Sequence, residues 1–400
     1  MTFTMPSCSV LLAAFVLAAA TGAFAQEPAS RAEEQARRQE EKARTAHPGP
    51  KNWLERKILD IEAAGGFGTP RGVMPTFGGI KSGSGLAPGV AHGKLFNNGT
   101  VALIKGGYSI RNFKLAQFSL APPPLAGGRL RFDSRVRWQD APSLAFYALG
   151  TPSPKTRADY SETKTEVSAS AAFRPARLLR LAGSIGFERF KTGPGGANTP
   201  RIETSFTLVP GVNADPDYLH TSGSVAIDSR DADGYSRRGT LLRATLHDYR
   251  QQNEGPYSFR RVDGAAEQYV PILQGNWVIY LGLHASTTTA GQGHEVPFFL
   301  MPDIGGSDLR GYDNRRFRDR HSMIFTAEYR WYVQEFVDLA LFYDAGKAVA
   351  HRRDLDVSGL KSNVGAGIRF HGPRSTPLRL EVARGTEGLR LIIAFSPIGG

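Results

Sequence analysis

Two acidic residues on neighbouring predicted strands, Glu328 and Asp344, could meet inside the protein. Successive side chains of a strand point to opposite faces, and this alternation places both residues on the polar faces of their strands. Two carboxylates that face one interior need cations, and Arg310 in the preceding loop is the candidate. A guanidinium group can bridge two carboxylates through paired hydrogen bonds. The pattern therefore predicts an ion-paired anchor, and the plainer alternative of hydrated charges in a wet interior stays open.

The sequence offers little that supports catalysis. A serine hydrolase needs a serine, a histidine and an acid that converge. His247 and His284 lie in mid-strand, but the nucleophile motif G-x-S-x-G does not occur. No zinc or calcium ligand spacing occurs either, and Asp228, Asp231 and Asp233 straddle a turn, where aspartate is a common turn former. We therefore expect no enzyme activity, no cofactor and no metal site.

The segment 296–320 must position Arg310, and it is a long, charged loop between two regular strand patterns. Gly305 and Gly306 start a bend in it. Its tip consists of Leu309, Arg310, Gly311 and Tyr312. A loop of this length is usually functional or disordered, and its many apolar and aromatic residues argue against disorder. We expect it to fold onto the inside of the structure that its flanks form.

From residue 73 onward, short segments alternate between apolar and polar residues, as half-buried strands do. In 129–138, for example, Leu130 and Phe132 share an apolar face. The opposite face carries Arg129, Arg131, Asp133, Arg135 and Arg137. The pattern predicts sixteen strands near 73–81, 85–95, 100–111, 113–121, 128–139, 159–173, 178–190, 218–229, 238–249, 257–270, 275–287, 321–333, 335–344, 360–371, 375–384 and 388–396.

Soluble β-sandwiches also alternate, but three observations favour a membrane barrel. The segments run to about ten residues, the length of a tilted spanning strand. Short turns alternate with long loops, at 139–158, 191–217 and 289–320, as in a barrel with one short-turn end. The residues expected to form an aromatic girdle near strand ends are Trp138, Tyr280, Tyr329, Trp331 and Tyr343. The sequence thus predicts an all-β fold, a transmembrane antiparallel β-barrel of about sixteen strands with a long loop in its lumen.

Residues 1–25 are typical of a secretory signal peptide. An apolar run at 10–20 precedes Ala23-Phe24-Ala25, which predicts cleavage before Gln26. The run is far shorter than the ~20 residues of a spanning helix. Residues 26–64 are predicted to form a polar, partly helical periplasmic segment, and 65–400 the barrel. The single cysteine, Cys8, lies in the signal peptide, so we expect a mature chain without thiol chemistry.

The formal net charge of +12 would by itself suggest nucleic acid or a membrane surface as partner. The basic residues, however, are scattered over alternate strand positions instead of forming one helix or patch. We therefore expect no nucleic-acid binding and, for a barrel, contact with outer-membrane lipid.

Five groups of motifs, in order, carry a resemblance to a known family. They are Asp228-Ser229-Arg230-Asp231 with Arg238-Gly239, Gly306-Ser307-Asp308-Leu309-Arg310-Gly311-Tyr312, Ala327-Glu328-Tyr329-Arg330, Phe342-Tyr343-Asp344-Ala345-Gly346, and Gly365-Ala366-Gly367-Ile368-Arg369 with Pro377-Leu378-Arg379-Leu380. The chain resembles the bacterial surface antigen family, whose barrel is shared by the assembly factors BamA and TamA and by two-partner-secretion transporters. The resemblance implies that the 306–312 motif folds into the lumen and meets Glu328 and Asp344, with Gly305, Gly306 and Gly346 in structural roles.

The assembly factors of this family carry POTRA domains before the barrel, which dock substrates or partners. Residues 26–64 are too few for an additional domain of ordinary size, so we expect a POTRA-less member. The resemblance implies a transporter or insertase for protein or lipid in the outer membrane of a Gram-negative bacterium, with an unfolded protein or a lipid as substrate. The alternatives are a passive, anion-favouring channel lined by Arg129, Arg131, Arg135 and Arg137, or a structural protein. The substrate and the oligomeric state stay open.

Overall fold

The computed structural model describes residues 72–395 except 197, 198, 207, 274, 275, 373–375 and 377. The predicted signal peptide and the 26–64 segment lie outside the described residues, so both stay predictions.

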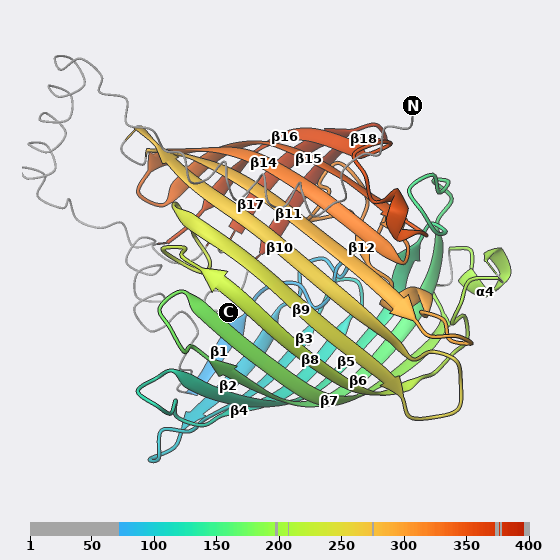
Figure 1. The fold of residues 1–400 in the computed structure, drawn as a ribbon, viewed down its shortest axis with the longest axis horizontal. Helices are drawn as coiled ribbons and strands as arrows, with labels where there is room; N and C mark the ends of the chain where they lie inside the picture. The colour runs from blue at the N-terminus through green and yellow to red at the C-terminus, as the bar shows by residue number, and fades with distance from the viewer. Residues whose placement is uncertain are drawn as a thin grey trace, which may run out of the picture. The chain divides into compact units, whose positions relative to one another are not determined.

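In the described residues, sixteen strands form one antiparallel sheet, and a separate pair of short strands lies in a loop (Figure 1). Its first eight strands are β1 (Gly72–Thr76), β2 (Gly89–Leu95), β3 (Val101–Tyr108), β4 (Lys114–Ala121), β5 (Leu130–Phe146), β6 (Ala158–Phe173), β7 (Leu179–Pro194) and β8 (Asp217–Asp228). The other eight are β9 (Gly239–Gln251), β10 (Phe259–Ile272), β11 (Trp277–Ala290), β14 (His321–Gln334), β15 (Val337–Val349), β16 (Lys361–Phe370), β17 (Leu378–Gly385) and β18 (Gly388–Phe395). Each strand pairs with its neighbours in the chain, so the topology is a plain meander.

Each predicted strand corresponds to one observed strand, which confirms the fold class and the strand number. The largest error concerns β5, which continues to Phe146 instead of ending near 139, so the long loop there covers only 147–157. A register shift between Ala141 and Leu144 lets β5 pass this point while still pairing with β6. Such an irregularity exchanges the faces of the strand, and for this reason two-residue alternation stops at the shift.

The outer face of the sheet carries apolar side chains in register. Across β3 to β7, the pairs Ile104↔Phe118, Phe118↔Val136, Val136↔Val167 and Val167↔Phe187 form one continuous row. All five side chains are exposed. A row of exposed large apolar residues would be a liability in water, whereas it matches the lipid-facing band of a membrane barrel.

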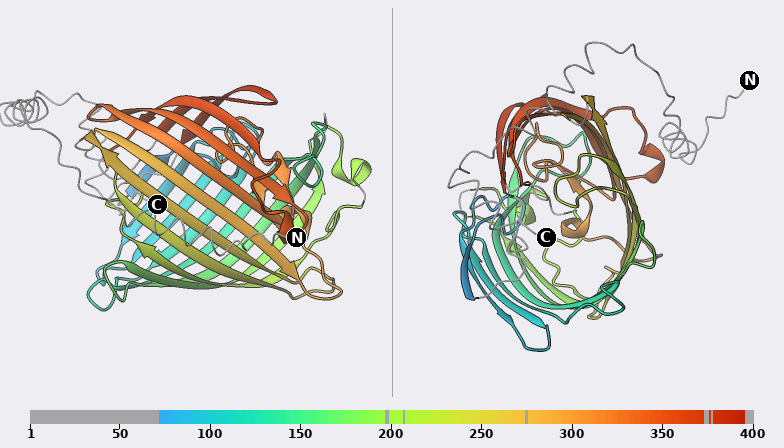
Figure 2. Two further views of the ribbon diagram at one scale, coloured as in Figure 1. Left: turned by 45° about the horizontal axis from the view of Figure 1, so that its top comes forward. Right: turned by 90° about the vertical axis from the view of Figure 1, so that its left-hand side faces the viewer.

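The sheet curls round on itself, and the segment 291–320 lies on its inner side (Figure 2). This segment contains η2 (Phe298–Leu300), β12 (Asp303–Ile304) and β13 (Phe317–Arg318). Two further short helices, α4 (Ile202–Ser205) and η3 (Arg352–Asp354), lie in other loops. Within the described part of the chain, no helix has the length and apolarity needed to span a membrane.

Loops and turns sort to the two ends of the barrel. The loops 77–88, 147–157, 195–216 and 291–320 follow β1, β5, β7 and β11, and we call their side the long-loop end. The turns that follow β2, β4, β6, β8, β10, β14 and β16 mark the short-turn end. At the short-turn end, the segment 229–238 between β8 and β9 is the longest connection.

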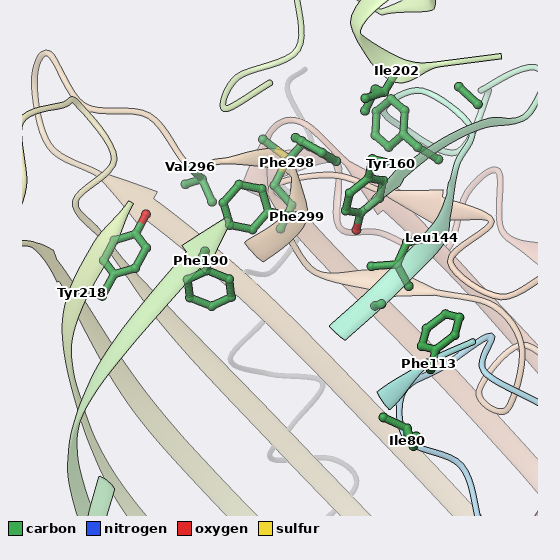
Figure 3. Close-up of a cluster of buried hydrophobic side chains, with 14 of the residues drawn as sticks. Ile80, Phe113, Leu144, Tyr160, Phe190, Ile202, Tyr218, Val296, Phe298 and Phe299 are labelled. Atoms are coloured by element: carbon green, nitrogen blue, oxygen red, sulfur yellow. The ribbon is translucent and has the colours of Figure 1, made fainter. Parts of the chain in front are cut away.

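An aromatic lid lies at the long-loop end (Figure 3). Phe298 of the 291–320 loop packs edge-on against Tyr160 of β6 and Phe146 of β5, with ring centroids 4.7 and 5.3 Å apart. Phe299 contacts Phe190 of β7 at 5.4 Å. The lid consists of the buried residues Phe146, Tyr160, Phe190, Tyr218, Tyr249, Phe259, Phe298 and Phe299. Burying such large aromatic surfaces is strongly favourable. The lid therefore holds the η2 part of the 291–320 loop against the barrel wall.

Candidate functional site

Glycines at the bend let the 291–320 loop fold back on itself. β12 pairs with β13, apart from the main sheet. Between them, Gly305 and Gly306 have φ values of +128° and +72°, which residues with a Cβ rarely adopt. A Cβ would lie 2.1 Å from the Asp313 backbone oxygen at Gly305, and 1.9 Å from Asn314 Oδ1 at Gly306. The bend therefore requires glycine at both positions.

Arg310 at the loop tip points its guanidinium into a group of carboxylates on the barrel wall. Its Nε and Nη2 donate to the two oxygens of Asp344 at 2.8 and 2.7 Å, in a forked arrangement. Its Nη1 donates to Glu328 at 3.1 Å and to Glu381 at 3.0 Å. The carboxylates come from β15, β14 and β17, and no side chain of the four is more than 3% exposed. One guanidinium thus ties the loop to three strands.

Two more arginines of the wall share these carboxylates. Arg330 Nε donates to Glu328 at 2.5 Å, and Arg369 pairs with Glu328 and, at 3.1 Å, with Glu381. We call the set the Arg310 cluster: Arg310, Arg330, Arg369, Glu328, Asp344 and Glu381. Its three carboxylates face three buried guanidinium groups, so the charges of the set balance, which limits the desolvation cost. At its edge, the partly exposed Arg379 lies 3.8 Å from Glu381.

Arg310 is held in its charged form. Burial by itself would lower the pKa of the guanidinium, but the hydrogen bonds to Asp344 and the charges of the three carboxylates keep that pKa above its ordinary value. A ring contact adds to this, because the guanidinium carbon lies 3.3 Å from the centroid of Phe342.

Gly311 and Tyr312 seat the backbone of the tip on β16 and β17. The Gly311 N–H donates to Asn363 Oδ1 at 3.0 Å. A Cβ at Gly311 would lie 2.5 Å from Asn363 Cβ and 2.8 Å from the Gly385 nitrogen, so no other residue fits without a shift. Tyr312 is fully buried, and its hydroxyl donates to the Ser362 backbone oxygen at 3.1 Å.

Leu309 and Gly346 complete the apolar side of the tip. Leu309 is fully buried in a small cluster with Ile304, Tyr312, Phe317, Ile324 and Ala348. Gly346 on β15 allows the loop to approach, because a Cβ there would lie 3.0 Å from Ile304 Cδ1. The four predicted tip residues and Gly346 therefore lie at the contact between loop and wall, whereas Gly305 and Gly306 form the bend within the loop.

Two further arginines anchor the part of the loop that follows the tip. Arg318 donates to Asp303 at 2.8 Å and to the Tyr160 hydroxyl at 3.3 Å. Arg316 donates to Glu387, in the turn between β17 and β18, and to Ser153 Oγ at 2.8 Å. The loop is thus anchored on both sides of its tip.

The segment 229–238 at the short-turn end also reaches across the interior. The Tyr235 hydroxyl donates to Asp338 of β15 at 2.7 Å, and its ring stacks on His371 at 3.8 Å. Arg330 donates to the Ser236 backbone oxygen at 3.2 Å. We call this segment the strap, because it ties β8 and β9 to β15, four strands further along the sheet than β9. Burial, followed by the hydrogen bond to Asp338, raises the pKa of Tyr235 above its ordinary value.

The family follows from a match over most of the barrel. A family model described as the Omp85 superfamily domain matches residues 95–387. The chain belongs to the Omp85 superfamily. This confirms the resemblance that the motifs indicated and makes the chain an outer-membrane β-barrel of a Gram-negative bacterium.

Solved structures show the same fold at low identity. The chain is similar to BamA from Haemophilus ducreyi lacking POTRA domains 1–3, with 13% identity, a TM-score of 0.59, and coverage of 85% of this chain and 77% of that chain. It is also similar to CdiB from Escherichia coli, with 11% identity, a TM-score of 0.53, and coverage of 81% of this chain and 60% of that chain. No curated protein matches the chain.

The geometry of this Omp85 barrel differs in two respects from the sequence-based interpretation. Arg310 contacts Glu381 as well as the two predicted carboxylates. The signal for Glu381 was present, because Leu378, Leu380 and Val382 alternate with it and mark its face as the inner one. The assignment of Tyr280 to an outer aromatic girdle is wrong.

Tyr280 points inward instead. It is paired in register with Glu328 and lines a cavity of about 310 Å³ beside the Arg310 cluster. By contrast, Trp138, Trp331 and Tyr343 are exposed, as a girdle requires. Sequence alternation alone misplaced Tyr280 because its strand is apolar on both faces near this point, at 277–283.

The two histidines considered for hydrolysis lie on the inner wall. His247 contacts His220 and Asp263, and His284 lies 3.7 Å from Glu267. Among the described residues, no group of three or more His, Cys, Asp or Glu side chains is placed to bind a metal ion.

Proposed function

We propose that this barrel moves or inserts protein or lipid at the outer membrane and that the 296–320 loop acts as a plug in its lumen. One observation carries the proposal: the loop is fixed inside the barrel without being part of the barrel sheet. β12 and β13 pair with each other, and the tip is held by the Arg310 cluster. Such a plug can move without breaking any pairing between the sixteen strands.

Membership of the Omp85 superfamily supports transport over a static role. The resemblance to assembly factors and secretion transporters points the same way, with an unfolded protein or a lipid as the class of substrate. The inner wall is polar and the outer wall apolar, so a cargo could use either the lumen or the lipid-facing surface.

A passive channel is the second candidate, and the inner face of β5 favours it. Arg131, Arg135 and Arg137 line this face, and Arg129 lies just before the strand begins. Of these, only Arg135 has an acidic group within 4 Å among the described residues, Asp133 at 3.9 Å. Unpaired guanidinium groups would favour anions. Against an open pore, the aromatic lid and the strap lie at the two ends of the barrel.

Deletion of the gene tests the proposal. We expect one class of outer-membrane proteins or lipids to be depleted in the deletion strain and restored by the wild-type gene. The same protein in planar bilayers should show no steady ohmic conductance. An unchanged membrane composition together with stable anion-selective conductance would instead establish the channel.

A further inference from the structure

Four side chains form a hydrogen-bonded row on the inner wall, away from the Arg310 cluster. They lie on consecutive strands: Glu188 on β7, His220 on β8, His247 on β9 and Asp263 on β10. His220 Nδ1 lies 3.0 Å from Glu188 Oε1, and His220 Nε2 lies 3.0 Å from His247 Nδ1. His247 Nε2 lies 3.1 Å from Asp263 Oδ2. We call this set the histidine row.

The number of protons in the row follows from its chemistry. Three short contacts link four acceptor-capable groups, and a carboxylate at each end can only accept when ionised. Each contact therefore needs one N–H proton. Two neutral imidazoles supply two protons, so the third contact requires one more, and the His220–His247 pair is a monocation. The planes of the two imidazole rings are 22° apart, and the 3.0 Å between the facing nitrogens is the length of a hydrogen bond in which one ring donates its N–H to the other.

Charged groups of the neighbouring strands surround the row. Lys164 of β6 lies 3.0 Å from Glu188 and 3.2 Å from Glu166, and Arg261 lies 3.0 Å from Asp263. Arg137 of β5 is paired in register with Glu166. The charged groups around the histidine pair are Arg137, Lys164, Glu166, Glu188, Arg261 and Asp263. Each of the three carboxylates has a cation as neighbour, so the number of protons on the pair follows from its hydrogen bonds.

The row touches the aromatic lid directly. His220 stacks on Tyr249 with ring centroids 4.1 Å apart and planes at 5°. Tyr249 stacks in turn on Phe259 at 4.7 Å and meets Tyr218 at 5.6 Å. Tyr218 contacts Phe190, which contacts Phe299 of the 291–320 loop. An unbroken series of ring contacts therefore joins His220 to the 291–320 loop.

We propose that the His220–His247 pair is a proton-binding site that controls the lid: it holds one shared proton when the lid is closed, and a second proton opens it. A second proton puts an N–H on both facing nitrogens. The two imidazolium groups then repel each other, their hydrogen bond is lost, and His220 moves beneath Tyr249. The ligand is the proton, and acidification of the medium is the signal. The inference concerns the lid and holds whatever the barrel transports.

Nitrogen-15 NMR of histidine-labelled full-length protein tests the shared proton without any substitution in the lid. At pH 7.5 the pair should carry three N–H groups, with the signals assigned through His220→Gln and His247→Gln. A pair with only two N–H groups at this pH would overturn the proposal. So would a bound metal ion, which would remove the N–H between the rings until a chelator restores it.

Protease cutting within 298–320 tests the link to the lid, using an enzyme active at both pH values and an unstructured reporter peptide for normalisation. Wild-type protein should be cut about tenfold faster at pH 5 than at pH 7.5, the scale expected for two sites whose titrations interact by one unit or more. Glutamine at either position can still donate and accept but cannot take a second proton, so each variant should lose this response.

His92→Gln is the control. His92 is an exposed residue of β2, paired in register with Val73 and Ile104, and lies outside the histidine row. This variant should keep the full pH response, and all variants should keep heat-modifiable mobility in gels. A pH response retained in both His220→Gln and His247→Gln, or lost in His92→Gln, would refute the link between the row and the lid.

Discussion

Arg310 and Asp344 meet in a closed fork, with both nitrogen–oxygen distances below 2.9 Å and both side chains removed from solvent. Asp344 also accepts from Asn363 at 2.9 Å and Thr326 at 3.1 Å, but Arg310 is its cationic partner among the described residues. The negative charge of the buried Asp344 is thus neutralised by a residue of the loop.

Arg310→Ala should release the loop while leaving the barrel intact. Removing one partner of a buried charged set costs about 3–5 kcal/mol, since the other charges stay buried without compensation. The strand pairings of the sheet do not involve Arg310, so heat-modifiable mobility should persist. Protease cutting within 298–320 should increase. Arg310→Lys should be only partly tolerated, because an ammonium group cannot reproduce the fork.

Exchanging the charges of Arg310 and Glu328 should not rescue the loop. The exchange would place a glutamate against Asp344 and Glu381, both of which are buried. A double variant Arg310→Glu, Glu328→Arg that is as protease-resistant as wild type would show that the three-carboxylate arrangement does not hold the loop.

Gly311→Ala should prevent the tip from seating on β16 and β17. The added methyl would lie 2.5 Å from Asn363 Cβ and 2.8 Å from the Gly385 nitrogen, and overpacking of this kind costs about 1–3 kcal/mol. Gly291→Ala is the control in the same loop, because its nearest neighbour would lie 3.9 Å away and its φ is not positive. Hydrogen exchange of peptides from 304–317 should rise in the first variant and stay unchanged in the second. Equal exchange in both would contradict the close fit.

Phe298→Ala should loosen the lid at the long-loop end. The side chain is 1% exposed and contacts three aromatic rings, and truncation of a buried phenylalanine costs about 3–5 kcal/mol. We expect faster exchange of 291–302 and brief conductance events in planar bilayers. Leu208→Ala, at a residue that is 96% exposed, should show neither effect. A silent bilayer record for both variants would mean that the lid does not limit ion flow.

Tyr235→Phe should weaken the strap, because Asp338 keeps its burial but loses the hydroxyl donor, at a cost of about 1–3 kcal/mol. The raised pKa of Tyr235 sets the pH dependence. The folded state favours the protonated phenol, so its contribution is complete below the ordinary tyrosine pKa of about 10 and declines only above it. Exchange of 229–238 should therefore differ between variant and wild type by the same factor at pH 7 and pH 9. A difference that disappears by pH 9 would show that Tyr235 does not act as a buried donor.

The number and order of strands could be predicted from sequence because each face of a barrel strand meets one environment. Lipid requires apolar side chains such as Phe118 and Val136 at every second position, and the lumen accepts charge at the positions between. Sequence alternation misled where a strand face does not meet a single environment. It failed near Tyr280, where the inner wall meets the aromatic and arginine side chains around the cluster, and at 141–144, where the register of β5 shifts.

The site was predicted in part for a similar reason. Arg310, Glu328 and Asp344 lie in motifs that stand out in the sequence, and face assignment brought the two carboxylates together. Glu381 is separated from Arg310 by 71 residues, and its contact depends on how far the sheet curls, which alternation does not determine. The histidine row depends on the alignment of four strands, so His247 could be placed on a strand but not beside His220.

The three carboxylates that bind Arg310 also link the docking of the loop to the correct pairing of three strands. Glu381 belongs to β17, which follows the loop in the chain, so the receiving pocket is complete only after nearly the whole sheet has formed. A slip of one residue in the pairing of β17 would turn Glu381 to the lipid face and leave the guanidinium with an incomplete set of partners. Complete docking of Arg310 therefore requires β17 to be paired in its native register.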